Sequence, residues 1–133
     1  MRLTTYSEYG LLALLYICRS KEEGYVPLQK IAREQKMPLK YLEHLMQPLC
    51  RKGYLTSRRG KNGGYRLSRP ANKITVAEIV RLFDGPLAAT ESVSEYFYKS
   101  TPIEKEQKLV GLFRDIRDYT ARKLERTTLA AVA

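Results

Sequence analysis

Cationic side chains and glycines are concentrated in one short segment, RRGKNGGYRLSRP, at residues 58–70. The segment holds five Lys or Arg residues and three glycines, and it contains no Asp or Glu. Basic side chains on a flexible loop can pair with phosphates, and glycines let the backbone approach a groove wall that a Cβ would obstruct. The segment therefore predicts contact with a polyanion, and the alternative is an ordinary solvated charged loop.

The stretch from Pro38 to Lys52 carries a second set of side chains suited to nucleic-acid chemistry. A helix over these residues would bury one apolar face and turn polar side chains to the opposite side. We expect the buried face to hold Leu39, Leu42, Leu45, Met46 and Leu49. The opposite side would hold Lys40, Glu43, His44, Gln47 and Arg51. Of the exposed residues, Lys40, Tyr41, Glu43, His44 and Gln47 can reach base edges or phosphates.

Two of these side chains have distinct expected roles. Glu43 gains nothing from phosphate but can accept a hydrogen bond from cytosine N4, so it is either a specificity element or a solvated surface acid. Arg59 suits a narrow minor groove, whose negative potential favours arginine. The candidate DNA-binding residues are Lys40, Tyr41, Glu43, His44, Gln47, Arg58, Arg59, Gly60, Lys61 and Arg66.

The net charge of the chain is +10, from 24 basic and 14 acidic residues. Up to Gly85 the counts are 16 and 7, and from Pro86 onward they are 8 and 7. The excess in the first part indicates an anionic partner such as nucleic acid or a lipid surface. No segment approaches the roughly 20 apolar residues that cross a membrane, and MRLTTYSEYG lacks a signal peptide's apolar run, so we expect a cytoplasmic protein without membrane contact.

Other chemistries find no suitable set of residues. GKNGG lacks the spacing of a P-loop, and one histidine with two isolated cysteines gives no zinc site. A catalytic triad would need His44 in a pocket, whereas its helix position points it outward. We therefore expect no enzyme activity, no metal and no cofactor. Cys18 and Cys50 are expected to be reduced core residues, with Cys50, beside Arg51 and Lys52, the better candidate for a lowered thiol pKa.

Three helices and a hairpin must position the candidate residues. Thr5-Tyr6-Ser7-Glu8 has the form of a capping box, so the first helix should begin there and end near Arg19. Leu28 to Gln35 fits a second helix, and the third begins at Pro38, with a kink or early loosening at Pro48. After Gly53 the period becomes that of two short antiparallel strands, with Leu55 and Ser57 in one and Tyr65 and Leu67 in the other.

The C-terminal part is predicted to be helical. A capping box, Thr75-Val76-Ala77-Glu78, should start a helix that Gly85-Pro86 ends. One short helix is expected near Val93 to Tyr98, where Tyr96, Phe97 and Tyr98 are either core or the lining of an effector pocket. A third box, Thr101-Pro102-Ile103-Glu104, should start a helix of about 25 residues ending near Arg126. The tail, TTLAAVA, could add one more turn.

The last helix is longer than its own domain needs, which predicts dimerisation; the alternative is a helix packed along its own domain. The candidate dimerisation residues are Leu109, Phe113, Ile116, Thr120 and Leu124. The predicted fold is mainly α with a small β-hairpin. It has a winged helix-turn-helix domain over residues 1–85, whose third helix enters the DNA major groove, and a linker with a long C-terminal dimerisation helix over residues 86–133.

This organisation predicts a sequence-specific DNA-binding transcription regulator. A protein-interaction subunit of the same fold, acting on an enzyme or another regulator, is the alternative. An RNA-binding protein is a third possibility, weakened because only Tyr41, Tyr54 and Tyr65 offer aromatic stacking positions in the basic unit.

Five stretches, MRLT, YLEHL, RRGKNGGYRL, RP and ITVAEIVRLFDG, resemble the Rrf-type family of bacterial winged-helix regulators that includes IscR, NsrR and CymR. The resemblance implies a homodimer whose long C-terminal helices pack across each other, with each third helix in a major groove of a palindromic operator, and a repressor as the expected activity. By motif position, Lys40, Tyr41, Glu43 and His44 match the family's base-reading residues. Arg59 and Gly60 match the part of the wing that enters the minor groove.

One stretch departs from the family pattern. Cluster-binding members carry three cysteines between the fourth helix and the long helix, and Gly85 to Lys105 contains none. Glu8 matches a position where some members place a non-cysteine ligand, but a carboxylate alone cannot hold an iron–sulfur cluster. We therefore expect no cluster. The resemblance is then closest to the cluster-free members, which respond to a small-molecule or protein effector.

Overall fold

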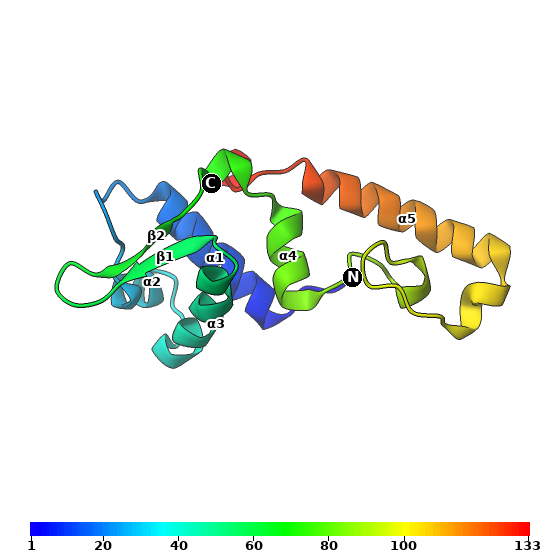
Figure 1. Cartoon of the computed structure of the whole chain (residues 1–133), viewed down its shortest axis with the longest axis horizontal. Helices are drawn as coiled ribbons and strands as arrows, with labels where there is room; N and C mark the ends of the chain where they lie inside the picture. Colours follow the sequence, from blue (N-terminus) through cyan, green and yellow to red (C-terminus); the bar gives the residue numbers. More distant parts are fainter.

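The computed structural model describes the whole chain, residues 1–133, as an elongated molecule with the hairpin at one end and a long helix at the other (Figure 1). The α-helices and strands are α1 (Thr5–Arg19), α2 (Leu28–Glu34), α3 (Leu39–Arg51), β1 (Leu55–Arg58), β2 (Gly64–Leu67), α4 (Val76–Asp84), α5 (Gln107–Glu125) and α6 (Leu129–Val132). Short 3₁₀ turns are η1 (Ala71–Lys73), η2 (Glu91–Val93) and η3 (Pro102–Lys105). The predicted class, mainly α with a small hairpin, is confirmed.

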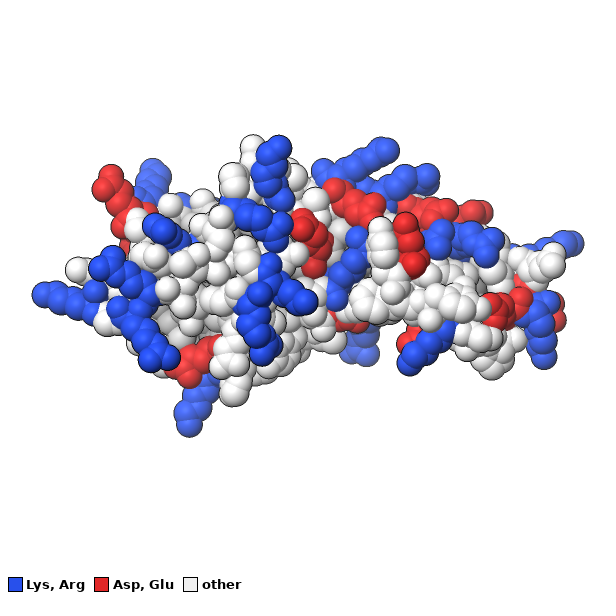
Figure 2. All heavy atoms as spheres, in the orientation of Figure 1, with Lys and Arg blue, Asp and Glu red and all other residues white.

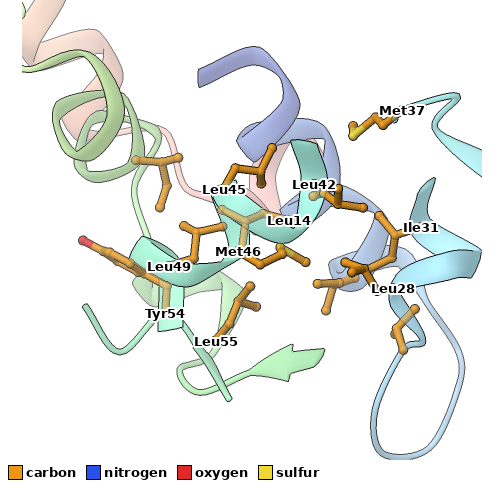
Figure 3. Close-up of a cluster of buried hydrophobic side chains, with 14 of the residues drawn as sticks. Leu14, Leu28, Ile31, Met37, Leu42, Leu45, Met46, Leu49, Tyr54 and Leu55 are labelled. Carbon is orange, nitrogen blue, oxygen red and sulfur yellow. The ribbon is translucent and has the colours of Figure 1, made fainter. Parts of the chain in front are cut away.

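One apolar core joins the first three helices to the hairpin. Most of its buried side chains come from α1, α2, α3 and β1, with Ile79 of α4 and Leu129 of α6 added, and Figure 3 shows part of this cluster. Fully buried members include Leu14, Ile31, Leu42, Leu45 and Leu49. The core therefore fixes the orientation of α3 relative to the hairpin.

The N-cap of the first helix lies one residue before the predicted N-cap. Thr4, rather than Thr5, is the N-cap, because its hydroxyl accepts the Ser7 N–H at 3.3 Å. Asp84, at the end of α4, accepts hydrogen bonds from the Thr4 N–H, at 3.0 Å, and from the Thr4 hydroxyl. A carboxylate from a distant helix therefore selects which threonine caps α1.

The third helix is continuous through its proline. The early loosening expected at Pro48 does not occur, since the helix continues to Arg51 and the Lys52 N–H donates to the Pro48 carbonyl at 3.0 Å. The predicted apolar face is buried except for Leu39, which is exposed at the first turn.

The two predicted antiparallel strands are present, with Leu55 opposite Leu67 and Arg58 opposite Gly64. The sequence did not reveal that β2 is paired on its other edge as well. Val26 and Tyr65 exchange two backbone hydrogen bonds, of 2.8 and 2.9 Å, so the segment before α2 acts as a third, one-residue strand. Gly64 permits this approach, because a Cβ there would lie 2.1 Å from the Val26 carbonyl oxygen.

The fourth helix begins and ends as predicted. Thr75 and Glu78 form the reciprocal capping box, and Gly85, with φ +81°, follows its last turn. The prediction of a helix near Val93 to Tyr98 is wrong, because the structure has only the 3₁₀ turn Glu91–Val93 in this region.

The long helix is shorter than predicted and the tail returns to the core. The third capping box does not form, because Pro102–Lys105 is a 3₁₀ turn and α5 starts at Gln107 and runs for 19 residues. The expected extra turn is present as α6. Its Leu129 is fully buried in the main core, and the Leu129 N–H donates to the Ile74 carbonyl at 2.9 Å. The division of the chain at residue 85 stays a prediction, with the tail packed against the first unit.

Candidate DNA-binding surface

The polar face of α3 is exposed as one strip. Lys40, Glu43, His44 and Gln47 are all exposed, and their spacing places them on the same side of the helix. The opposite side is fixed in the core, so these side chains project from a rigid element. Side chains of these types can donate to or accept from base edges in the major groove.

Tyr41 differs from the other predicted α3 residues. It is half-buried, and its ring packs against the rings of Tyr6, at 5.0 Å between centroids, and Tyr9, at 5.4 Å. Loss of hydration raises the pKa of the Tyr41 hydroxyl, with smaller contributions from Tyr6 and Tyr9. The ring is therefore packed against other rings of the protein. The hydroxyl is the part of Tyr41 that is left to contact another molecule.

The tip of the hairpin exposes Arg58, Arg59, Gly60 and Lys61. Gly60 has φ +87°, a conformation that a side chain would strain, and the turn also uses a positive φ at Asn62, which the sequence analysis did not single out. Figure 2 shows basic side chains gathered over the end of the molecule that carries the hairpin and α3, whereas both signs alternate over α5.

The basic residues of the hairpin region fall into three groups. Arg59 and Lys61 make no ion pair and are free to neutralise an external anion. Arg69 is held within the protein, 3.5 Å from a Glu78 carboxylate oxygen and 4.2 Å from the centre of the Tyr54 ring. Arg58 and Arg66 are exposed and lie over the ring of Tyr25.

An open hollow of about 450 Å³ lies between the start of α2 and the hairpin tip. Its lining includes Gln29 and Asn62 beside the predicted Arg58, Arg59 and Gly60. Gln29 was not among the predicted residues, because the pairing of Val26 with Tyr65, which brings the start of α2 beside the hairpin, has no local sequence signal. Asn62 lies within the tip and is distinguished only by its positive φ.

The residues between α4 and α5 do not fit a metal or an iron–sulfur cluster. No group of three His, Cys, Asp or Glu residues lies close enough to hold a metal ion. Hydroxyls fill this region instead: Thr101 donates to Ser92 at 2.7 Å and lies 3.2 Å from the Thr90 hydroxyl. Glu104 accepts hydrogen bonds from Ser100 and Tyr98, which hold its pKa below the usual range.

Neither cysteine has the environment of a reactive thiolate. Cys18 and Cys50 are half-buried in α1 and α3, and burial raises the pKa of both thiols. The expectation that Cys50 is the better candidate for a lowered pKa is therefore wrong. Desolvation of the Cys50 thiol outweighs the lowering effect of the nearby Ser57.

Tyr96, Phe97 and Tyr98 are neither core nor the wall of a large pocket. All three are exposed. Tyr96 and Phe97 border a cavity of about 10 Å³, which has room for about one water molecule.

The apolar stripe of α5 differs from the predicted set. Leu109 and Ile116 are exposed, Phe113 and Thr120 are half-buried, and Leu124 packs against the small cluster of Ala77, Val80, Leu87 and Ala121 in its own chain. Leu112 and Tyr119 are exposed but were not in the predicted set. We call Leu109, Leu112, Ile116 and Tyr119 the α5 stripe; their alternating spacings of three and four residues were the signal for it.

None of the helices combines the length and apolar character that a membrane span requires.

The whole chain is similar to known transcription regulators. The HTH-type transcriptional regulator CymR of Bacillus subtilis is 32% identical over 133 residues, which cover 100% of this chain and 90% of CymR. The HTH-type transcriptional regulator IscR of Xenorhabdus nematophila is 41% identical over 90 residues, covering 68% of this chain and 55% of IscR.

Solved structures agree with these sequence relationships. CymR, the global cysteine regulator of B. subtilis, has a TM-score of 0.80 at 31% identity, covering 100% of this chain and 96% of the CymR chain. IscR of T. potens has a TM-score of 0.69 at 27% identity, covering 99% of this chain and 85% of the other. The family model described as Rrf2, iron-dependent transcriptional regulator, matches residues 3–133. The chain therefore belongs to the Rrf2 family and is a DNA-binding transcription regulator of the winged helix-turn-helix type.

Proposed function

We propose that the protein is a homodimeric repressor that binds a palindromic operator through α3 and the hairpin, without an iron–sulfur cluster. The observation that carries the proposal is the exposed polar strip of α3 beside a hairpin whose Arg59 and Lys61 have no partner within the chain. In this arrangement the hairpin binds phosphates, and the α3 strip reads base edges in the major groove.

The proposed dimer rests on the α5 stripe. Its side chains are 39 to 69% exposed, although they are large and apolar and lie on one face of a single helix. Leaving such a face in water is unfavourable, and heptad-like spacing suits packing against an identical helix. A second copy of the chain is therefore the proposed occupant, and its two-fold symmetry would match a palindromic site.

The absence of a cluster is proposed from the donor chemistry. Iron–sulfur clusters are bound mainly by cysteine thiolates, and the segment between α4 and α5 offers hydroxyls that are already bonded to one another. A small-molecule or protein effector is then the proposed signal.

The proposal is tested by selecting genomic DNA fragments on the purified protein and measuring binding to the recovered duplex. If about six to ten phosphates are neutralised per dimer, affinity should fall by roughly 10³ to 10⁵ between about 50 and 200 mM salt. A repressor should lower transcription from a promoter that contains the site. Retention of no fragment at low salt would contradict DNA binding and favour a protein-interaction role.

Arg59 supplies a matched test of the hairpin. Arg59→Ala should weaken binding most at sites with a narrow A/T-rich minor groove, because the potential there is most negative. Arg114→Ala, which removes an exposed arginine from α5, is the control and should bind as the wild type does. An equal loss of affinity on all sequences would contradict insertion of Arg59 into the minor groove.

A further inference from the structure

We propose that Tyr25 is a positioning residue of the DNA-binding surface: its ring holds Arg58 and Arg66 in place for contact with the DNA backbone. The inference rests on the proposed DNA-binding function. The guanidinium carbon of Arg66 lies 4.7 Å from the centre of the Tyr25 ring, and that of Arg58 lies 5.9 Å from it. Both distances are within the range of cation–π attraction.

The backbone explains why Tyr25 reaches both arginines. Val26 pairs with Tyr65 in an antiparallel bridge, so the preceding residue, Tyr25, comes next to Arg66 in the same register. Side chains alternate between the faces of a strand. Val26 is buried, and Tyr25 therefore lies on the outer face together with Arg66.

Arg58 belongs to the same outer face. It is opposite Gly64 in the hairpin, two residues along β2 from Arg66, which makes the two arginines diagonal neighbours. Gly64 has no side chain to separate them. The Tyr25 ring is the aromatic group that both guanidinium groups contact.

The arrangement has a consequence for binding. Two exposed arginines on neighbouring strands repel each other, and each samples many rotamers. Holding both in fixed positions on DNA therefore costs free energy, which weakens binding. The negative face of an aromatic ring attracts both guanidinium groups and restricts their positions before DNA arrives. No carboxylate forms an ion pair with Arg58 or Arg66, so their charge stays available for phosphates.

The test compares Tyr25→Leu and Tyr25→Phe in binding to the duplex recovered by genomic selection. Tyr25→Leu removes the ring and should weaken binding by about fivefold or more, because both arginines must then be ordered when the DNA binds. Tyr25→Phe keeps the ring and should bind within about twofold of the wild type. In the background Arg58→Ala/Arg66→Ala, Tyr25→Leu should have no further effect, because the residues that it positions are absent.

A measurement on the free protein checks the geometry without DNA. The Arg66 side-chain NMR resonances should be shifted by the ring current in the wild type and in Tyr25→Phe, and should lose that shift in Tyr25→Leu. Thermal melting of each variant reports on folding. Absence of the ring-current shift in the wild type would overturn the proposal even if Tyr25→Leu did not fold.

The other outcomes separate this inference from the proposed function. If the wild type binds DNA and Tyr25→Leu binds equally well, positioning is wrong while DNA binding stands. Equal losses of affinity in Tyr25→Phe and Tyr25→Leu would assign the effect to the hydroxyl. A loss of affinity that is as large in the Arg58→Ala/Arg66→Ala background would assign it to folding. Either outcome would overturn the positioning role of Tyr25. A wild type that binds no duplex at about 50 mM salt overturns the proposed function and this role with it.

Discussion

The side chains of α3 and of the hairpin differ in what they can offer to DNA. On the exposed strip of α3, Glu43 opposes the charge of Lys40, and the other exposed cation of the helix, Arg51, lies at its last residue. Arg59 and Lys61 on the hairpin have no such opposition. We infer that affinity comes mainly from the hairpin and base choice mainly from α3, since phosphate contacts position a protein and base contacts specify the sequence.

Glu43→Ala should relax base preference without lowering total affinity. A carboxylate that accepts from cytosine N4 contributes about 1–3 kcal/mol of discrimination, while its charge repels phosphates. The measurement is competition between the selected operator and duplexes with single base changes under α3. Glu8→Ala, an exposed acid on α1, is the control and should keep the base preference. A uniform loss of affinity over all sequences would contradict a specificity role for Glu43.

At the level of helices and strands, local patterns predicted most elements, and long-range contacts decided the rest. The box Thr75 to Glu78 formed as predicted because one Glu78 carboxylate oxygen accepts from the Thr75 N–H while the other faces Arg69 and the Tyr54 hydroxyl. The similar box at Thr101 did not form, because Tyr98 and Ser100 donate to the Glu104 carboxylate and engage it elsewhere.

The missed features depend on residues far apart in the chain. Periodicity indicated both hairpin strands, but no local pattern shows that Val26 pairs with Tyr65, the contact that places Tyr25 and Gln29 beside the hairpin. For the same reason, the burial of Leu129 in the main core was not predictable from the short tail that contains it. The α3 strip and the hairpin tip were predictable because helical period and charge pattern are local.

Asp84→Asn should destabilise the fold by about 1 kcal/mol at neutral pH, because the carboxylate holds the Thr4 cap and favours the positive end of the α1 dipole. Burial raises the pKa of Asp84, but the hydrogen bonds from the Thr4 hydroxyl and the Thr4 N–H outweigh it and hold the pKa below its usual range. The stabilisation is therefore present above pH 3.8 and is lost as pH falls through the lowered pKa of the folded state.

Urea denaturation of wild type and Asp84→Asn at neutral pH, and again below pH 3.8, measures this contribution. The difference in the free energy of unfolding should shrink at the lower pH. Asp115→Asn, at an exposed position of α5 without an ion pair, is the control and should change stability by less than about 0.5 kcal/mol. A pH-independent difference would contradict a role for the Asp84 charge.

At the scale of the whole molecule, two ends of different character are joined by α4. The core of α1 to α3 and the hairpin lies at one end, and α5 lies at the other (Figure 1). The side chains of the α5 stripe are exposed. The chain then returns through α6, whose Leu129 enters the core, so α5 is anchored at its C-terminal end to the DNA-binding unit. Pairing of two α5 helices would therefore fix the relative positions of two α3 helices.

Ile116→Glu should convert the proposed dimer to monomers, because it puts a charge at the middle of the α5 stripe. The dimer gains from binding two half-sites at once, so affinity for the palindromic operator should fall by about 10²-fold or more, while affinity for an isolated half-site should stay near that of the wild type. Sedimentation velocity gives the oligomeric state, and binding to both duplexes gives the affinities.

Val132→Glu, at an exposed apolar position outside the stripe, should remain dimeric. An Ile116→Glu protein that is still dimeric would show that the two chains meet elsewhere, whereas a monomer with unchanged operator affinity would show that DNA binding does not require the dimer.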